Sequence, residues 1–174
     1  MFEVYHPATQ AWKKQALQDA GIAIPPGTTF VPVDFERSTL AEGLRQAGFR
    51  ADQPACFSWL GVVVYLTRDA IFDTLRFVAS LPAGSAITFD YRALPSLLNP
   101  VERAIGEFIA TQIAQQGEPW KSAFDPATFA SEIRALGFSE ARDYAPDELN
   151  ARYLARRKDG LRTGGGFRLM GARV

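Results

Sequence analysis

Residues 85–91, Ser-Ala-Ile-Thr-Phe-Asp-Tyr, form the clearest predicted strand of the chain. A helix precedes them. Thr67 is its expected N-cap, and Leu81-Pro82 ends it, because proline cannot continue a helix. Before that helix, residues 54–64 begin as another apolar strand. Strands that alternate with helices in this way are typical of an α/β fold in which most strands of the sheet run parallel.

The same alternation continues toward both ends of the chain. Further strands are expected at residues 2–5, 28–33, 138–144 and 167–174. Further helices are expected at residues 8–20, from an N-cap at Ser38 to near Gly48, and at residues 101–116, 127–136 and 147–157. The chain segment that connects the last two strands is short, so we expect these strands to pair antiparallel.

Length and charge limit the class of protein. The 174 residues fit one ordinary domain with a single core. The 19 basic residues balance the 19 acidic ones, so no broad basic field offers a site for nucleic acid or for an anionic membrane. The first residues lack the pattern of a signal peptide, and no apolar run approaches the ~20 residues of a spanning helix. We therefore expect a cytoplasmic protein.

The chain has one cysteine, Cys56, and one histidine, His6. This count excludes a Cys/His zinc site, and no carboxylate pattern indicates another metal. Cys56 lies in an apolar predicted strand, where we expect a buried structural thiol. His6 stands just before Pro7, and we expect it to cap the next helix or to face solvent rather than to act in catalysis.

Acidic residues stand where predicted strands end. In an open α/β sheet, ligands bind beyond the carboxyl ends of the strands. Glu3 closes the first strand, Asp34 the second and Asp90 the fourth. One carboxylate can accept both ribose hydroxyls, a second can accept an adenine amino group, and the rings of Phe35 and Trp59 could flank the base. The pattern leaves two interpretations: these residues form a nucleoside site, or they are acidic loop residues that face solvent.

Four strings occur in order along the first part of the chain: FEVYHPATQAWK (2–13), FVPVDF (30–35), FSWLGVVVYLT (57–67) and GSAITFDY (84–91). Together they resemble the leucine carboxyl methyltransferase-like family. This family includes many bacterial S-adenosylmethionine-dependent methyltransferases, among them O-methyltransferases of polyketide pathways. The resemblance covers residues 2–91 and weakens through the C-terminal half.

The resemblance implies a class I methyltransferase sheet with strand order 3-2-1-4-5-7-6, in which strand 7 is antiparallel. It implies that Glu3 binds the ribose of S-adenosylmethionine and that Asp34, beside Phe35, approaches the adenine. It also implies that the segment containing Trp59 and Leu60 lines the methionine part of this cofactor and the substrate.

The sequence departs from the family pattern in three ways. The glycine-rich loop and first strand of the family have no counterpart upstream of Glu3, so we expect a single truncated methyltransferase-like domain over residues 1–174. Leu60 and Tyr5 stand where acidic residues are common in the family. Without strand 1, two interior edges of the sheet would carry unpaired backbone groups. Direct pairing of strands 2 and 4, a second copy in a homodimer, or a longer protein would each repair the sheet.

Two functions remain open. The first is an S-adenosylmethionine-dependent O-methyltransferase, or the C-terminal part of one, that acts on a carboxylate or hydroxyl of a small acid or polyketide-like acceptor. The second is a degenerate, non-catalytic module that acts through self-association or a partner. Neither requires nucleic acid, a membrane or a metal.

Overall fold

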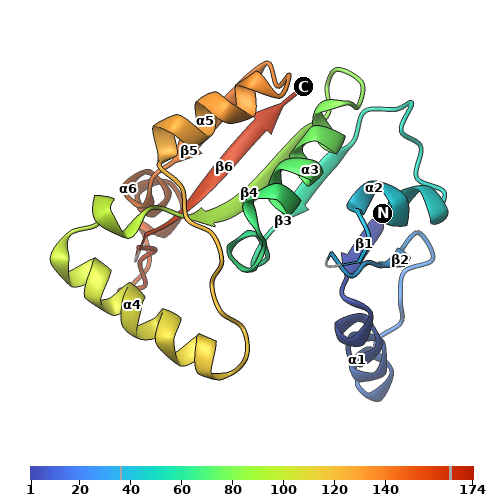
Figure 1. The fold of residues 1–174 in the computed structure, drawn as a ribbon. Coiled ribbons are helices and arrows are strands. Elements are labelled where there is room, and N and C mark those ends of the chain that lie inside the picture. Colours follow the sequence, from blue (N-terminus) through green and yellow to red (C-terminus); the bar gives the residue numbers. More distant parts are fainter. Residues whose placement is uncertain (36, 165) are drawn as a thin grey trace. The chain divides into compact units, whose positions relative to one another are not determined.

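The computed structural model describes residues 1–35, 37–164 and 166–174 (Figure 1). Its strands are β1 (Phe2–Tyr5), β2 (Thr29–Pro32), β3 (Cys56–Trp59), β4 (Ala86–Arg92), β5 (Glu140–Tyr144) and β6 (Phe167–Arg173). Its α-helices are α1 (Pro7–Asp19), α2 (Leu40–Gln46), α3 (Arg68–Ala79), α4 (Pro100–Gln115), α5 (Pro126–Ala135) and α6 (Pro146–Leu149). Shorter helical segments are η1 (Val63–Tyr65), η2 (Pro95–Leu97) and η3 (Asn150–Leu154). The predicted α/β class is confirmed.

The chain divides into two compact units, Met1–Gln53 and Pro54–Val174. In the first unit, β1 and β2 pair in parallel, with Glu3 opposite Phe30. Parallel neighbours need a crossover connection, and the segment containing α1 provides it. Helix α2 follows β2 and lies close to it at Gly43, where a Cβ atom would lie 3.3 Å from Val31 Cγ1 of β2 and 2.4 Å from Cγ2 of Val33, the residue after β2.

Helix α2 begins one residue later than predicted. Its N-cap is Thr39, whose hydroxyl accepts a hydrogen bond from the Glu42 amide, while the Glu42 carboxylate accepts one from the Thr39 amide. The Ser38 hydroxyl instead donates to the carbonyl of Asp34 at 3.1 Å. Serine and threonine both suit an N-cap, but only Thr39 stands three residues before a glutamate, so it alone can form this capping box.

In the second unit the strand order is β3-β4-β6-β5. Strands β3 and β4 are parallel, and β6 runs antiparallel to both β4 and β5. This confirms the antiparallel pairing predicted for the last two strands. The neighbours match the 3-2 and 4-5-7-6 parts of the strand order that the family resemblance implied.

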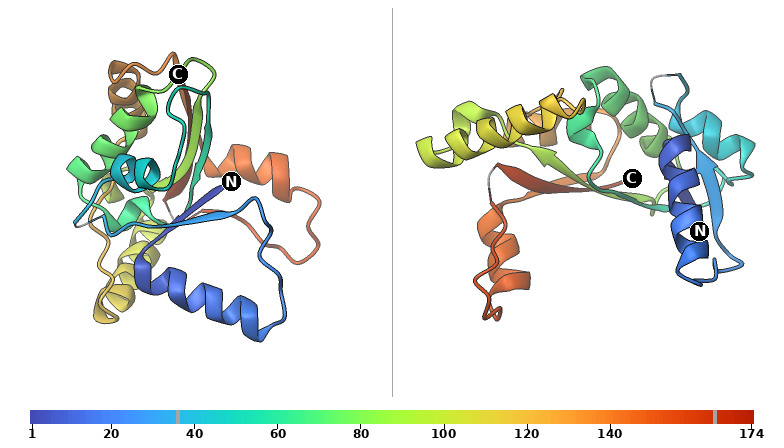
Figure 2. Two further views of the ribbon diagram at one scale, coloured as in Figure 1. Left: turned by 90° about the vertical axis from the view of Figure 1, so that its right-hand side faces the viewer. Right: turned by 90° about the horizontal axis from the view of Figure 1, so that it is seen from below.

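The core of the second unit lies on one side of its sheet, under α3 and α5, while α6 and η3 lie on the other side (Figure 2). Alternation along β4 turns Ile87, Phe89 and Tyr91 into this core, where each is at most 1% exposed. Phe129 of α5 packs against Phe89 and Tyr91, with ring centres 5.9 and 5.2 Å away. The Tyr91 hydroxyl reaches through this core to donate to Asp143 of β5 at 2.6 Å.

Three residues differ from their predicted positions. Cys56 is exposed rather than buried, because side chains alternate along β3 and the core contacts come from Phe57 and Trp59. Glu3 lies inside β1, whose last residue is Tyr5. Asp90 lies inside β4, which continues to Arg92. None of the described helices is long and apolar enough to cross a membrane.

Candidate functional site

Glu3 of β1 forms an ion pair with Lys13 of α1. The hydrogen bond between them raises the pKa of Lys13 above its ordinary value. The Lys13 ammonium also lies 4.9 Å from the centre of the Tyr5 ring, which is on the same face of β1 as Glu3. The Glu3 side chain keeps 21% of its surface exposed. The contact with Lys13 therefore leaves part of the Glu3 side chain accessible.

Asp34 lies two residues beyond β2, where the Val33 amide donates to the Tyr5 carbonyl at 2.9 Å. This bond extends the pairing of the two strands by one residue, so that Asp34 lies just beyond their carboxyl ends. There the Asp34 carboxylate lies 4.0 Å from His6 Nε2 and 3.7 Å from Arg37 Nε, with 28% of the side chain exposed. The ends of β1 and β2 thus bring Tyr5, His6 and Asp34 together, as expected for adjacent parallel strands.

His6 caps α1. Its Nδ1 atom accepts a hydrogen bond from the Ala8 amide at 3.4 Å. This agrees with the structural role predicted for it. Phe35 follows Asp34 directly and is half-buried in the first unit.

Trp59 and Leu60 belong to the second unit, at the end of β3. The Trp59 ring packs on the core, 5.9 Å from the ring centre of Phe89. The Leu60 side chain is 56% exposed. Gly61 then turns the chain at a positive φ of 70°, and its amide donates to Asp90 Oδ1 at 2.7 Å. Asp90, which the sequence suggested as a ligand-binding acid, is thus engaged in fixing the loop after β3.

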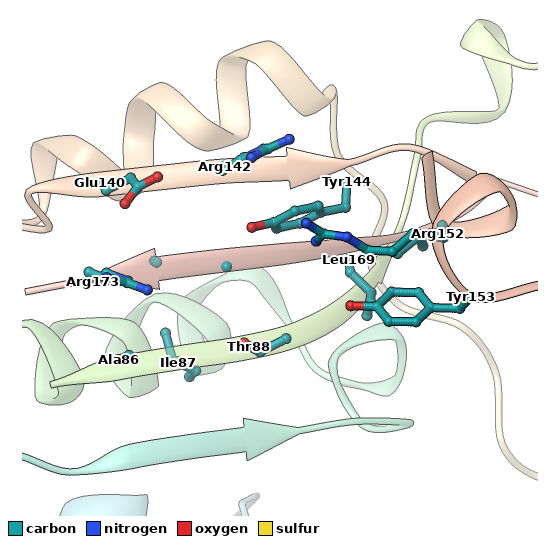
Figure 3. Close-up of a pocket in the computed structure, with 13 residues that line it drawn as sticks. Ala86, Ile87, Thr88, Glu140, Arg142, Tyr144, Arg152, Tyr153, Leu169 and Arg173 are labelled. Carbon is teal, nitrogen blue, oxygen red and sulfur yellow. The ribbon is translucent and has the colours of Figure 1, made fainter. Parts of the chain in front are cut away.

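A pocket of about 290 Å³ lies on the face of the second unit's sheet that carries α6 and η3 (Figure 3). Side chains from β4, β5 and β6 form its floor, and Arg152 and Tyr153 of η3 stand over it. Arg142 of β5 is already engaged, through an ion pair with Glu148 at 2.7 Å and through the Tyr144 ring at 4.7 Å. The sequence gave no signal for this pocket, which depends on the antiparallel pairing of β5 and β6.

Metal ligands are not gathered anywhere in residues 1–35, 37–164 and 166–174, where no group of three His, Cys, Asp or Glu side chains could hold an ion. Near the strand ends, the carboxylates of Glu3 and Asp34 can accept hydrogen bonds from hydroxyl and amino groups.

Comparison with known proteins identifies a family whose model matches part of this chain. Residues 1–79 match the family model described as leucine carboxyl methyltransferase. YktD of Bacillus subtilis, named as an S-adenosyl-L-methionine-dependent methyltransferase, is 35% identical over 164 residues, which are 92% of this chain and 53% of YktD. The chain therefore spans about half the length of this relative.

Solved structures show the same fold. The S-adenosylmethionine-dependent methyltransferase SibL, in its apo form, superposes with a TM-score of 0.60 at 12% identity, over 99% of this chain and 42% of SibL. A DUF574 family protein from Streptomyces avermitilis gives 0.62 at 17% identity, over 99% of this chain and 64% of that one.

The strand order and these likenesses define the class of fold, which is that of the class I S-adenosylmethionine-dependent methyltransferases. Within this class, the match of residues 1–79 to the leucine carboxyl methyltransferase model confirms the resemblance over the first three of the four strings.

Proposed function

We propose that this chain carries the S-adenosylmethionine site, or part of it, of an O-methyltransferase. The acceptor in this proposal is a carboxylate or hydroxyl of a small acid or polyketide-like compound. The observation that supports it most directly is the family match over residues 1–79, which include Glu3, Asp34 and Phe35. The name of the relative YktD supports the same reaction class.

The acceptor groups of the first unit fit the nucleoside part of the cofactor. In this proposal Glu3 accepts hydrogen bonds from the ribose hydroxyls, Asp34 accepts one from the adenine amino group, and Phe35 flanks the base. The side chains of Glu3 and Asp34 are 21% and 28% exposed, so both are accessible to a ligand. Lys13 has to share Glu3 with the ribose or release it.

Trp59 and Leu60 are proposed to contact the methionine part of the cofactor and the acceptor. Leu60 offers an exposed apolar side chain for this purpose. The bond from the Gly61 amide to Asp90 joins the segment after β3 to β4. A binding loop that is already ordered loses less entropy when the ligand arrives.

Bound S-adenosylmethionine supplies an electrophilic methyl group, and the protein's task in such a displacement is mainly to position the acceptor oxygen in line with it. A carboxylate acceptor is already ionised near neutral pH, so it needs no strong base. This agrees with the structure of the first unit, where the one histidine of the chain uses Nδ1 to cap α1.

Transfer of a labelled methyl group to a panel of acids tests the proposal. Methyl esters hydrolyse in alkali and release volatile methanol, whereas methyl ethers do not, so alkali treatment of the product separates carboxylate from hydroxyl acceptors. Label in either fraction, lost in a Glu3→Ala variant, supports the proposal. The absence of labelled product with every acceptor, in a sample that binds the cofactor, would contradict the activity.

A second candidate is a non-catalytic module that self-associates. In the described part of the chain, β1 and β3 each have a strand partner on one edge. A free edge presents unpaired N–H and C=O groups that a second copy can pair in a homodimer. Sedimentation distinguishes the candidates: a dimer that binds no cofactor favours the module, and a monomer that binds it removes the basis for the module.

A further inference from the structure

Arg92 is a buried cation for which the described residues supply no hydrogen-bond acceptor. It is the last residue of β4 and is 8% exposed. Its Nε and Nη2 atoms are buried and have no hydrogen-bond partner in the part of the chain that the structure describes. Buried polar groups are nearly always paired, and an unpaired buried charge costs several kcal/mol. Such an arrangement calls for an acceptor that residues 1–35, 37–164 and 166–174 do not supply.

Trp120 adds a third donor of the same kind. The Arg92 guanidinium carbon lies 4.7 Å from the centre of the Trp120 ring. The indole Nε1 of Trp120 is also buried, and the described residues offer it no acceptor. Guanidinium and indole N–H groups can only donate. Three buried donors on two stacked side chains therefore lack an acceptor in the same neighbourhood.

The fold holds these two side chains at the ligand-binding edge of the sheet. The Phe124 amide donates to the Arg92 carbonyl at 2.9 Å, and the Leu94 amide donates to the Phe124 carbonyl at 3.0 Å. The Ser122 hydroxyl donates to the Val63 carbonyl of η1 at 2.9 Å. Residues 120–124 are thus fastened across the carboxyl ends of β3 and β4, where α/β proteins bind their ligands.

Glu107 of α4 is the acidic residue that acts on Arg92. Burial lowers the pKa of Arg92 and the negative charge of Glu107 opposes that shift. The described residues nevertheless contain no ion pair between them, and Glu107 is exposed. The guanidinium is therefore influenced by Glu107 but not neutralised through a hydrogen-bonded contact.

We propose that Arg92 and Trp120 form a subsite for a carboxylate group of the methyl acceptor. The unpaired Nε and Nη2 atoms are adjacent donors on one edge of the guanidinium, a geometry that matches the two oxygens of a carboxylate. The surroundings are aromatic, with Phe167 5.3 Å from Trp120 between ring centres. Desolvation in such a setting favours a singly charged carboxylate over a doubly charged phosphate. The assignment to the acceptor rests on the proposed function.

NMR of the full chain tests the subsite without the cofactor. The three tryptophans give three indole N–H signals, and Trp12 and Trp59 serve as internal controls. Benzoate is expected to shift the Trp120 signal in a saturable way, whereas benzamide, its neutral analogue, is not. An Arg92→Gln change should weaken benzoate binding at least tenfold. An equal response to benzamide, a preference for inorganic phosphate, or unchanged binding by Arg92→Gln would overturn the proposal.

Two matched variants on α4 sharpen the result. Glu107→Gln removes a negative charge near the subsite and should strengthen benzoate binding severalfold, whereas Arg103→Gln, on the exposed surface of the same helix, should leave it unchanged. Weaker binding by Glu107→Gln would contradict the proposal.

Stability gives an independent measure. If the role of Arg92 is to bind a ligand, the Arg92→Met variant should unfold at the same urea concentration as the wild type or at a higher one. The reason is that the change removes an unpaired buried charge. A clear loss of stability would show that Arg92 has a structural role and would overturn the subsite. Because none of these measurements uses S-adenosylmethionine, their failure is distinguishable from failure to bind the cofactor.

Discussion

The backbone amide of Gly61 donates a hydrogen bond to the carboxylate of Asp90, with 2.7 Å between N and Oδ1. The bond joins the loop after β3 to the neighbouring strand β4. Gly61 adopts a positive φ that side chains rarely tolerate, so the turn and its acceptor fix the direction of the chain together.

Replacement of Asp90 by alanine should loosen this loop. We expect the free energy of unfolding to fall by about 1 kcal/mol, the usual contribution of one hydrogen bond. Amide exchange at Gly61 should accelerate more than exchange in the centre of β4. Asp90→Asn keeps an acceptor oxygen and should fall between alanine and wild type. Unchanged exchange at Gly61 in the alanine variant would show that the bond does not order the loop.

Asp143 joins two partners from neighbouring strands. It accepts from the Tyr91 hydroxyl at 2.6 Å and from Arg168 Nε at 2.8 Å, and the side chains of Asp143 and Arg168 are 18% and 22% exposed. Removal of one partner from such a pair leaves the other unpaired, so Asp143→Ala should cost about 3–5 kcal/mol. Tyr91→Phe should cost about 1–2 kcal/mol, because it removes one hydrogen bond to a charged group.

Urea unfolding measures both changes. The matched control is Asp52→Asn, since Asp52 pairs with Arg50 at the exposed surface, and it should unfold at the wild-type midpoint. A loss of stability in the control as large as that in Asp143→Ala would contradict this account.

Tyr91 should make stability fall at alkaline pH. Burial, and then its hydrogen bond to Asp143, raises the pKa of Tyr91 well above the ordinary value. The folded protein therefore keeps this proton after the unfolded chain has lost it, so the contribution is complete below about pH 10 and declines as the pH rises further. Urea unfolding across this range should show a steeper decline for wild type than for Tyr91→Phe. Parallel declines would contradict the assignment.

Gly43 is expected to resist substitution. A Cβ atom there would lie 2.4 Å from Cγ2 of the buried Val33, whose branched side chain has little freedom to move. Overpacking of about 1–3 kcal/mol should outweigh the roughly 1 kcal/mol that alanine adds to helix propensity. Gly43→Ala should therefore lower the free energy of unfolding. Gly27→Ala, with open space at its Cβ, is the control and should change it little.

Local patterns were sufficient to predict most of the fold. The strand that contains Phe89, Asp90 and Tyr91 and the N-cap at Thr67 follow from β-propensity and capping chemistry, which are properties of neighbouring residues. The exposure of Cys56 could not be predicted in this way. Whether a β-strand residue is buried depends on which face of the sheet the helices cover, and that is decided by residues distant in sequence.

The candidate site was predictable only in part. Glu3 and Asp34 could be chosen because acids near strand ends are visible in the sequence, but the contact of Glu3 with Lys13 depends on how α1 returns over β1. Arg92 and Trp120 are 28 positions apart, and their stacking depends on the bridge between Ala93 and Phe124. The strand was predicted from the sequence as far as Tyr91, one residue short of Arg92, whereas the chain segment that covers Arg92 was not predicted.

Titration calorimetry with S-adenosylhomocysteine, on a sample of known mass in solution, measures whether the first unit holds the cofactor. We expect binding near micromolar strength to wild type, weakened at least tenfold by Glu3→Ala and unchanged by Asp52→Asn. An absence of binding heat at millimolar ligand, or equal binding by wild type and Glu3→Ala, would contradict the claim that the first unit holds the cofactor.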